Sequence, residues 1–313
     1  SGIGRVFMNS KVHEDGVAVH FSMASIRGAW ITDGRIEARV ANVNSTSNNY
    51  AELVRRRGLW VRQLERQGIQ FRFVATPQIE RGELDNYKVL ILPYSIALSD
   101  REIAAIERFL DRGGIVYADE QTGRMDERCR WRREPLWTAP RPALLRGEPR
   151  AVSIQPGFVV GDGDFLVTVR DFGASRLIGA LTREPRAVTL PPVDRVRYDL
   201  LRGGPASNHV ETSAISPILL LERASRIAKL ELSPALDLRL TDEKGAPVDR
   251  SVVRIEVTDP SGKVVRHYTG NRTIRDGTAR FEIPFALNDV KGRWRVRARD
   301  VISGLTAERT LER

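Results

Sequence analysis

The 313-residue sequence predicts one α/β domain with a parallel sheet, followed by two all-β sandwich domains. Two observations carry this prediction. Over the first 125 residues, apolar strand patterns alternate with amphipathic helix patterns, and the links are short, as expected for parallel strands joined by crossover helices. From about residue 151 the helical period gives way to short strand patterns separated by Gly and Pro, which is typical of antiparallel sandwiches.

Four short apolar segments predict the strands of the α/β domain. They are residues 17–21, 69–74, 88–92 and 115–118. The third, Val-Leu-Ile-Leu after Lys88, is apolar at every position, so we expect it to be buried on both faces of the sheet.

Two helices are expected between these strands. Residues 50–67 place apolar side chains on one face at a 3.6-residue spacing, and Gly68 follows as a stop. The second helix begins at Ser99, whose spacing to Glu102 is that of a capping box, and it ends at Gly113.

Two other stretches of the first part have a different character. Residues 22–49 are polar and rich in Ser, Thr and Asn, and we interpret them as a functional or interface loop. Residues 128–150 are rich in Arg, Pro and Trp, and we interpret them as a linker that lies against a surface.

The β part predicts two sandwiches. Strand patterns cover 165–170, 176–181, 187–190, 195–200 and 217–221, and then 236–240, 252–257, 263–268, 278–283 and 293–299. Residues 263–268 are expected to pair with 252–257 through the turn at Asp259, and Trp294 is expected to point inward. The last unit fits an immunoglobulin-like sandwich. We therefore divide the chain into domains 1–127, 151–226 and 227–313, with the linker 128–150.

The charge and the Cys and His content exclude several function classes. The net charge of +10 comes from 44 Arg and 6 Lys against 40 acids, and it is spread evenly along the chain, whereas nucleic-acid binders concentrate their charge. The one cysteine, Cys129, and four widely spaced histidines form no metal motif, and no glycine-rich phosphate loop follows the first strand. No apolar run is long enough to span a membrane. We expect no metal, no cofactor, no nucleic acid and no membrane span.

Polar residues follow three of the predicted strands, and ligands of open parallel sheets gather at that edge. The candidate strand-end cleft consists of His20, Ser22, Tyr94, Ser95, Asp119 and Glu120. A Ser–His–acid set could be formed by Ser95, His20 and Glu120. An enzyme of this kind requires Ser95 Oγ and His20 within hydrogen-bond reach, with donor amides nearby.

Other details weigh against catalysis, and we assign no catalytic residue. A nucleophile elbow needs small neighbours, but no glycine flanks Ser95. Asp119 and Glu120 are consecutive and would point to opposite faces of a strand, so they form a poor acid and nucleophile pair for glycoside hydrolysis. Structural roles for these polar residues, or binding of a ligand without catalysis, are the alternatives.

Three segments together resemble the trimerisation domain of the family 42 β-galactosidases. They are Gly16-Val-Ala-Val-His-Phe-Ser-Met-Ala-Ser25 with Ala29-Trp30, Lys88-Val-Leu-Ile-Leu-Pro-Tyr-Ser-Ile-Ala-Leu-Ser-Asp100, and Phe109-Leu-Asp-Arg-Gly-Gly-Ile-Val-Tyr-Ala-Asp119. The resemblance implies a flavodoxin-like fold of the class I glutamine amidotransferase type that has lost its chemistry. Tyr94-Ser95 at the elbow position, without a Cys, agrees with that loss. In that family a catalytic barrel precedes this domain, and no stretch here supplies one.

We therefore expect the non-catalytic C-terminal assembly portion of a larger bacterial glycoside-hydrolase-like protein. The sequence starts at Ser1 without an initiator Met, which fits a piece of a longer chain. Its partners would be further copies of itself or the catalytic domain of the same parent, with Trp30, Trp131 and Trp137 as candidate interface residues. The alternatives are a hydrolase or amidotransferase-like enzyme acting around Ser95, and a carbohydrate-binding or surface-adhesion module carried by residues 151–313. One cysteine and immunoglobulin-like modules favour export.

Overall fold

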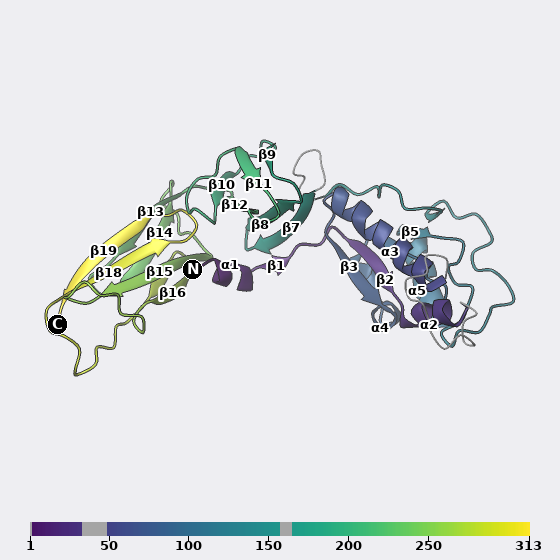
Figure 1. Cartoon of the computed structure of the whole chain (residues 1–313), viewed down its shortest axis with the longest axis horizontal. Helices are drawn as coiled ribbons and strands as arrows, with labels where there is room; N and C mark the ends of the chain where they lie inside the picture. Colours follow the sequence, from purple (N-terminus) through teal and green to yellow (C-terminus); the bar gives the residue numbers. More distant parts are fainter. Residues whose placement is uncertain (1, 33–48, 157–164) are drawn as a thin grey trace. The chain divides into compact units, whose positions relative to one another are not determined.

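The structure is a computed structural model that describes residues 2–32, 49–156 and 165–313 (Figure 1). These residues form mostly β-sheet with few helices. Contacts divide the chain into two compact units: an α/β unit, Glu14–Val159, and a β unit composed of Ser1–His13 and Val160–Arg313. In the described ranges, every helix is too short or too polar to cross a membrane.

The described part of the α/β unit is built on one five-stranded parallel sheet. Its strands are β2 (Val17–Phe21), β3 (Phe71–Ala75), β4 (Val89–Leu92), β5 (Ile115–Ala118) and β6 (Leu144–Arg146), in the order β3-β2-β4-β5-β6. Its helices are α2 (Met23–Ile31), α3 (Asn49–Arg66), α4 (Thr76–Glu80), the 3₁₀ helix η1 (Glu83–Asn86) and α5 (Asp100–Asp111).

Helices bury both faces of this sheet. Leu90 of β4 packs in one core with Phe109 of α5, whereas its neighbour Ile91 packs in another core with Trp60 and Leu64 of α3. This alternation explains why β4 is apolar and buried at every position, as its sequence predicts.

The local signals at the second predicted helix are confirmed. Ser99 Oγ accepts a hydrogen bond from the backbone N–H of Glu102 at 3.0 Å, and Glu102 Oε2 accepts one from the backbone N–H of Ser99 at 2.8 Å. Gly113, just past the helix, has a φ of +92°, a conformation that glycine adopts without strain.

Two of the interpretations differ from the structure. Within 22–49, predicted to be a loop, residues 23–31 form helix α2, because Ser22 Oγ accepts the N–H of Ser25 and so caps it. Residues 33–48 lie outside the described residues. Within 128–150, predicted to be a linker, residues 144–146 form β6, which pairs in parallel with β5.

The β unit consists of antiparallel sheets. One contains β1 (Lys11–Val12), β7 (Phe165–Phe172), β8 (Ser175–Thr182), β12 (Ile218–Arg223) and β10 (Val196–Asp199), in the order β1-β7-β8-β12-β10. A small sheet pairs β11 (His209–Thr212) with β9 (Arg186–Thr189). Helix α1 (Ile3–Met8) also belongs to this unit.

The C-terminal strands form two further sheets of this unit. One contains β13 (Ile227–Leu232), β14 (Asp237–Asp242) and β17 (Thr278–Arg280). The other contains β16 (Gly270–Ile274), β15 (Ser251–Thr258), β18 (Arg293–Asp300) and β19 (Thr306–Glu312), in the order β16-β15-β18-β19. Trp294 of β18 is 2% exposed and packs in the hydrophobic core of this unit, as predicted from the alternation of apolar and charged residues in its strand.

The predicted partner of residues 252–257 is wrong. The turn at Asp259 forms, with Gly262 N–H donating to the Asp259 carbonyl, but a single bridge between Thr258 and Val264 is the only strand pairing of 263–268 in the described part of the chain. The partner of β15 is β16, which begins two residues after 268. The chain leaves β15 because it turns a second time after Val265, whose carbonyl accepts the N–H groups of Tyr268 and Thr269.

Candidate functional site

The carboxyl edge of the parallel sheet holds the predicted strand-end residues, but in two separate groups. His20 and Ser95 turn into the protein, where they meet Glu102 of α5. Tyr94 and Asp119 form the second group: the Tyr94 backbone N–H donates to Asp119, and Asp119 also lies near Arg56 of α3. The six predicted residues therefore do not line one open cleft.

A buried hydrogen-bonded chain connects Ser95, His20 and Glu102. His20 Nδ1 lies 2.9 Å from Ser95 Oγ, and His20 Nε2 lies 3.0 Å from Glu102 Oε1. The acid of this set is Glu102 and not Glu120, which was the predicted member. Glu102 escaped the prediction because its spacing to Ser99 identifies it as a capping residue, and it fills both roles with its two oxygens.

This serine, histidine and acid are in the order of a hydrolytic triad, but they are sealed from solvent. Ser95, His20 and Glu102 are 1%, 2% and 1% exposed. Their hydrogen bonds to one another give these buried polar groups the partners that burial requires. Burial alone would raise the pKa of Glu102, but the hydrogen bond and charge of His20 outweigh it and hold that pKa below its ordinary value.

Tyr94 occupies the turn that follows β4, where the sequence resemblance places the elbow. Its φ of +50° lies in the left-handed region that non-glycine residues rarely adopt. Its backbone N–H donates to Asp119 Oδ2 at 2.7 Å, and its hydroxyl donates to Asn49 Oδ1 at 3.0 Å. Tyr94 is 3% exposed, and its ring packs in a core with Leu53 of α3 and Ile96.

Asp119, directly after β5, holds this edge together. Its Oδ1 accepts the backbone N–H of Gln121 at 3.0 Å and the hydroxyl of Thr122 at 3.2 Å, in addition to the Tyr94 bond. Burial raises the pKa of Asp119 above its ordinary value, and these hydrogen bonds together with the charge of Arg56 offset only part of that rise.

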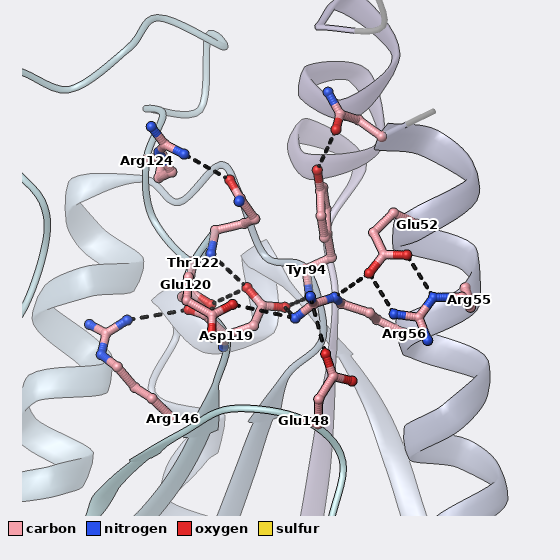
Figure 2. A network of polar contacts seen from close by, with 12 residues as sticks. Glu52, Arg55, Arg56, Tyr94, Asp119, Glu120, Thr122, Arg124, Arg146 and Glu148 are labelled. Carbon is pink, nitrogen blue, oxygen red and sulfur yellow. Dashed lines mark hydrogen bonds and ion pairs between the residues drawn. The ribbon is translucent and has the colours of Figure 1, made fainter. Parts of the chain in front are cut away.

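Arg56 is the centre of the polar network at this edge (Figure 2). Its guanidinium lies 2.6 Å from Glu52, 3.3 Å from Glu148, and 3.7 Å from both Asp119 and Glu120. The Arg56 side chain is 15% exposed, whereas that of Glu120 is 68% exposed. Hydrogen bonds from Arg55 and Arg56 lower the pKa of Glu52 to about 2. Arg56 was not predicted, because its four partners come from three separate segments.

Ser22, another predicted cleft residue, has a structural task. Besides accepting the N–H of Ser25, its Oγ donates to the carbonyl of Ala97 at 3.4 Å. Ser22 thus caps α2 and joins it to the loop after β4.

An open groove of about 500 Å³ lies beside Glu120. Its walls include Arg124, Arg146 and both predicted interface tryptophans of this segment, Trp131 and Trp137. Trp131 is 56% exposed, and the guanidinium of Arg124 lies 5.2 Å from its ring centre. Trp137 is half-buried and packs against the core that contains α5. The groove has acid, base and aromatic groups, but no nucleophile and base within it contact each other in the described residues.

Trp30, the third predicted interface residue, lies on α2. It is 61% exposed, and Met23 and Ile31 on the same helix are 52% and 46% exposed. In the described ranges, no three His, Cys, Asp or Glu side chains are grouped as a metal site. In the β unit, Trp294 is buried and the Tyr268 hydroxyl is bonded to Asp289, so these two aromatics do not form the exposed sugar-binding surface considered for 151–313.

We compared the chain with protein-family models, curated proteins and solved structures. No family model and no curated protein matches the chain. Among solved structures, a catalytic mutant of Gan42B, a GH42 β-galactosidase from G. stearothermophilus, matches 68% of this chain and 41% of its own at 12% identity, with a TM-score of 0.50.

Two other solved structures match a similar share of the chain. The β-galactosidase from Rahnella sp. R3 has 13% identity and a TM-score of 0.47, and that from Bacillus circulans sp. alkalophilus has 14% and 0.44. Each match covers 68% of this chain and 42% of the other. The chain thus spans about two fifths of the length of these proteins. The match to Gan42B, with its TM-score of 0.50, relates the fold of this chain to that of a GH42 β-galactosidase.

Proposed function

We propose that the chain is the non-catalytic assembly portion of a larger glycoside-hydrolase-like protein. The observation that carries this proposal is the closed elbow. Tyr94 fills the place where a nucleophile would stand, with its N–H bonded to Asp119 and its hydroxyl bonded to Asn49. An α/β unit with a strand-end edge closed in this way has the framework of an enzyme site without access for a substrate.

The finer fold assignments belong to the same proposal. The strand order β3-β2-β4-β5-β6 corresponds to 2-1-3-4-5 in chain order, the order of flavodoxin-like sheets, and it supports a flavodoxin-like domain of the amidotransferase type. The four-stranded and three-stranded sheets around Trp294 support an immunoglobulin-like last domain. The boundaries at 127, 150 and 226 stay predictions.

The enzyme alternative has one observation in its favour, the Ser95–His20–Glu102 chain. Its hydrogen-bond distances of 2.9 and 3.0 Å meet the geometric requirement. Its burial counts against an enzyme, because each of the three residues is at most 2% exposed and a substrate would not reach Ser95. The assembly role therefore accounts for more of what the strand-end edge contains.

Helix α2 offers the face for assembly. Met23, Trp30 and Ile31 expose large apolar surfaces on one short helix, and Arg27 lies between them. A surface with an aromatic, a methionine and an arginine has the composition favoured in protein interfaces. We assign this face to contact between copies of the chain.

Sedimentation of the purified chain tests this role. We expect a mass that is a multiple of the 35.2 kDa of one chain. Trp30→Ser should shift the protein toward the monomer. Ile215→Ser is the matched control, because Ile215 is 95% exposed but lies in the β unit. A monomer at all concentrations, or equal shifts for the two variants, contradicts assembly through α2.

A further inference from the structure

A basic groove lies on the β unit, apart from the site described above. It has a volume of about 280 Å³ and is open to solvent. Its floor is the outer face of β15 and β18, and its walls are the turn around Arg202 and Gly203 and the first residues of α1. Four arginines line it, with Glu256 as the acidic member.

Two of these arginines stand directly opposite each other. Arg254 of β15 and Arg299 of β18 are cross-strand partners in the antiparallel ladder. Their outward side chains start about 5 Å apart, and like charges in this position destabilise a sheet. Among the described residues, neither forms an ion pair with a carboxylate, although Arg299 Nη2 donates to the carbonyl of Arg202 at 3.3 Å.

The other two arginines of the groove have acidic partners. Arg297 Nε lies 3.4 Å from Glu308, and Arg202 pairs with Asp199 at 2.9 Å. Glu256 stands opposite Arg297 in the ladder and offsets part of the charge of its neighbours. The arginines without an acidic partner of their own are Arg254 and Arg299.

The turn beside Arg299 is shaped to leave room for its guanidinium. Gly203 has a φ of +74°, and a Cβ there would lie 2.8 Å from Arg299 Nη2. Any other residue would strain the backbone at this φ, and its Cβ would displace the guanidinium from its present position. The glycine thus allows Arg299 to lie over the turn, with Leu201 (52% exposed) as an apolar neighbour.

We propose that this groove binds the oxyanion group of a small ligand between Arg254 and Arg299. Paired guanidiniums provide the forked donors that suit carboxylate, sulfate and phosphate oxygens, and a bound anion would offset the repulsion between the two arginines. The volume suits a ligand of about one sugar ring rather than a polymer. Leu201, Ile3 and Val301 would contact the less polar part of that ligand. This proposal does not depend on the assembly role.

Titration with simple anions tests the proposal. Sodium sulfate, sodium phosphate and sodium glucuronate are added to the full chain, and binding is measured by calorimetry and by the rise in Tm, with glucose as the neutral probe. We expect saturable binding of at least one anion and none of glucose. Tighter binding of glucuronate than of the inorganic anions would identify an acidic sugar, whereas equal or weaker binding would identify a free oxyanion.

Variants separate binding from a structural effect. Arg254→Gln and Arg299→Gln should each weaken binding by about tenfold or more, because each removes a charge-assisted donor. Their Tm without ligand should equal or exceed that of the wild type, because the like-charge contact is lost. Arg295→Gln is the control: Arg295 points outward from the same strand, faces Thr258 and Thr310 across its two neighbours, and lies outside the groove.

Two results would overturn the proposal. One is the absence of saturable binding for all three anions. The other is binding that Arg254→Gln and Arg299→Gln leave as strong as Arg295→Gln does. If a glutamine variant fails to fold, the lysine variant at the same position keeps the charge without the fork and should weaken binding relative to Arg295→Gln; binding as strong as that of Arg295→Gln would overturn the proposal.

Discussion

The backbone N–H of Tyr94 donates a 2.7 Å hydrogen bond to Oδ2 of Asp119. This bond joins the turn after β4 to the end of β5, the two strand ends between which an elbow nucleophile would act. It also holds Tyr94 in a left-handed conformation with its ring buried. The turn after β4 and the end of β5 are therefore held together by specific contacts, whose contributions to stability can be measured residue by residue.

Substitutions at Tyr94 should separate strain from packing. Tyr94→Phe should cost about 1 kcal/mol of unfolding free energy, because it removes the hydroxyl bond to Asn49. Tyr94→Ala should cost about 3 kcal/mol or more through the lost ring. Tyr94→Gly should cost less than Tyr94→Ala by about 1 kcal/mol, because glycine adopts positive φ without strain. Urea unfolding measures all three, and a glycine variant less stable than the alanine variant contradicts the strained turn.

Replacing Arg56 should lower the free energy of unfolding far more than replacing its neighbour Arg55. Arg56→Ala leaves Glu52, Asp119 and Glu148 without their shared cation at a site where Arg56 is 15% exposed, and we expect a loss of about 2–3 kcal/mol. Arg55→Ala removes a pair whose arginine is 49% exposed and should cost below about 1 kcal/mol. Denaturant unfolding of both variants checks this, and equal losses would mean that Arg56 does not organise the strand ends.

The buried Glu102 should make stability depend on pH. Its folded pKa lies below the ordinary value of 4.5, so its contribution is present above that value and is lost as the pH falls through the folded pKa. Glu102→Gln keeps a capping side chain but removes the charge, and at about pH 7 it should cost about 1–2 kcal/mol. This difference from the wild type should shrink in acid. The control is Glu107→Gln, on the same helix. A difference that is constant between about pH 7 and about pH 3 would contradict the role of the charge.

Elements formed by neighbouring residues could be predicted from the sequence. Apolar runs and the Ser99–Glu102 spacing identify strands and a helix start, because they express burial and capping within one turn or strand. Helix α2 was missed because its apolar residues are not confined to one face and so give little amphipathic period. Ser22, which caps it, was interpreted as part of a polar loop. The shift of the β15 partner to β16 depends on the second turn after Val265, which the alternating strand pattern of 263–268 does not indicate.

The candidate site was predictable only in part, because its contacts join distant segments. His20 and Ser95 could be placed at one edge of the sheet from their positions after strands, and they do meet. Their acid could not be identified: Glu102 is 82 residues from His20, and its sequence context already explains it as a cap. The left-handed turn at Tyr94 was equally hidden, since an aromatic residue rarely adopts that conformation.

An activity assay of the full chain tests the central claim most directly. Wild type, Ser95→Ala and Glu120→Gln are purified and incubated with an aryl β-galactoside and, separately, with an aryl ester and with glutamine. Because Ser95 is 1% exposed and the turn at Tyr94 is bonded to Asp119, we expect no turnover above background for any protein or substrate. Turnover by the wild type at an enzyme-like rate that either variant abolishes would contradict a non-catalytic assembly role.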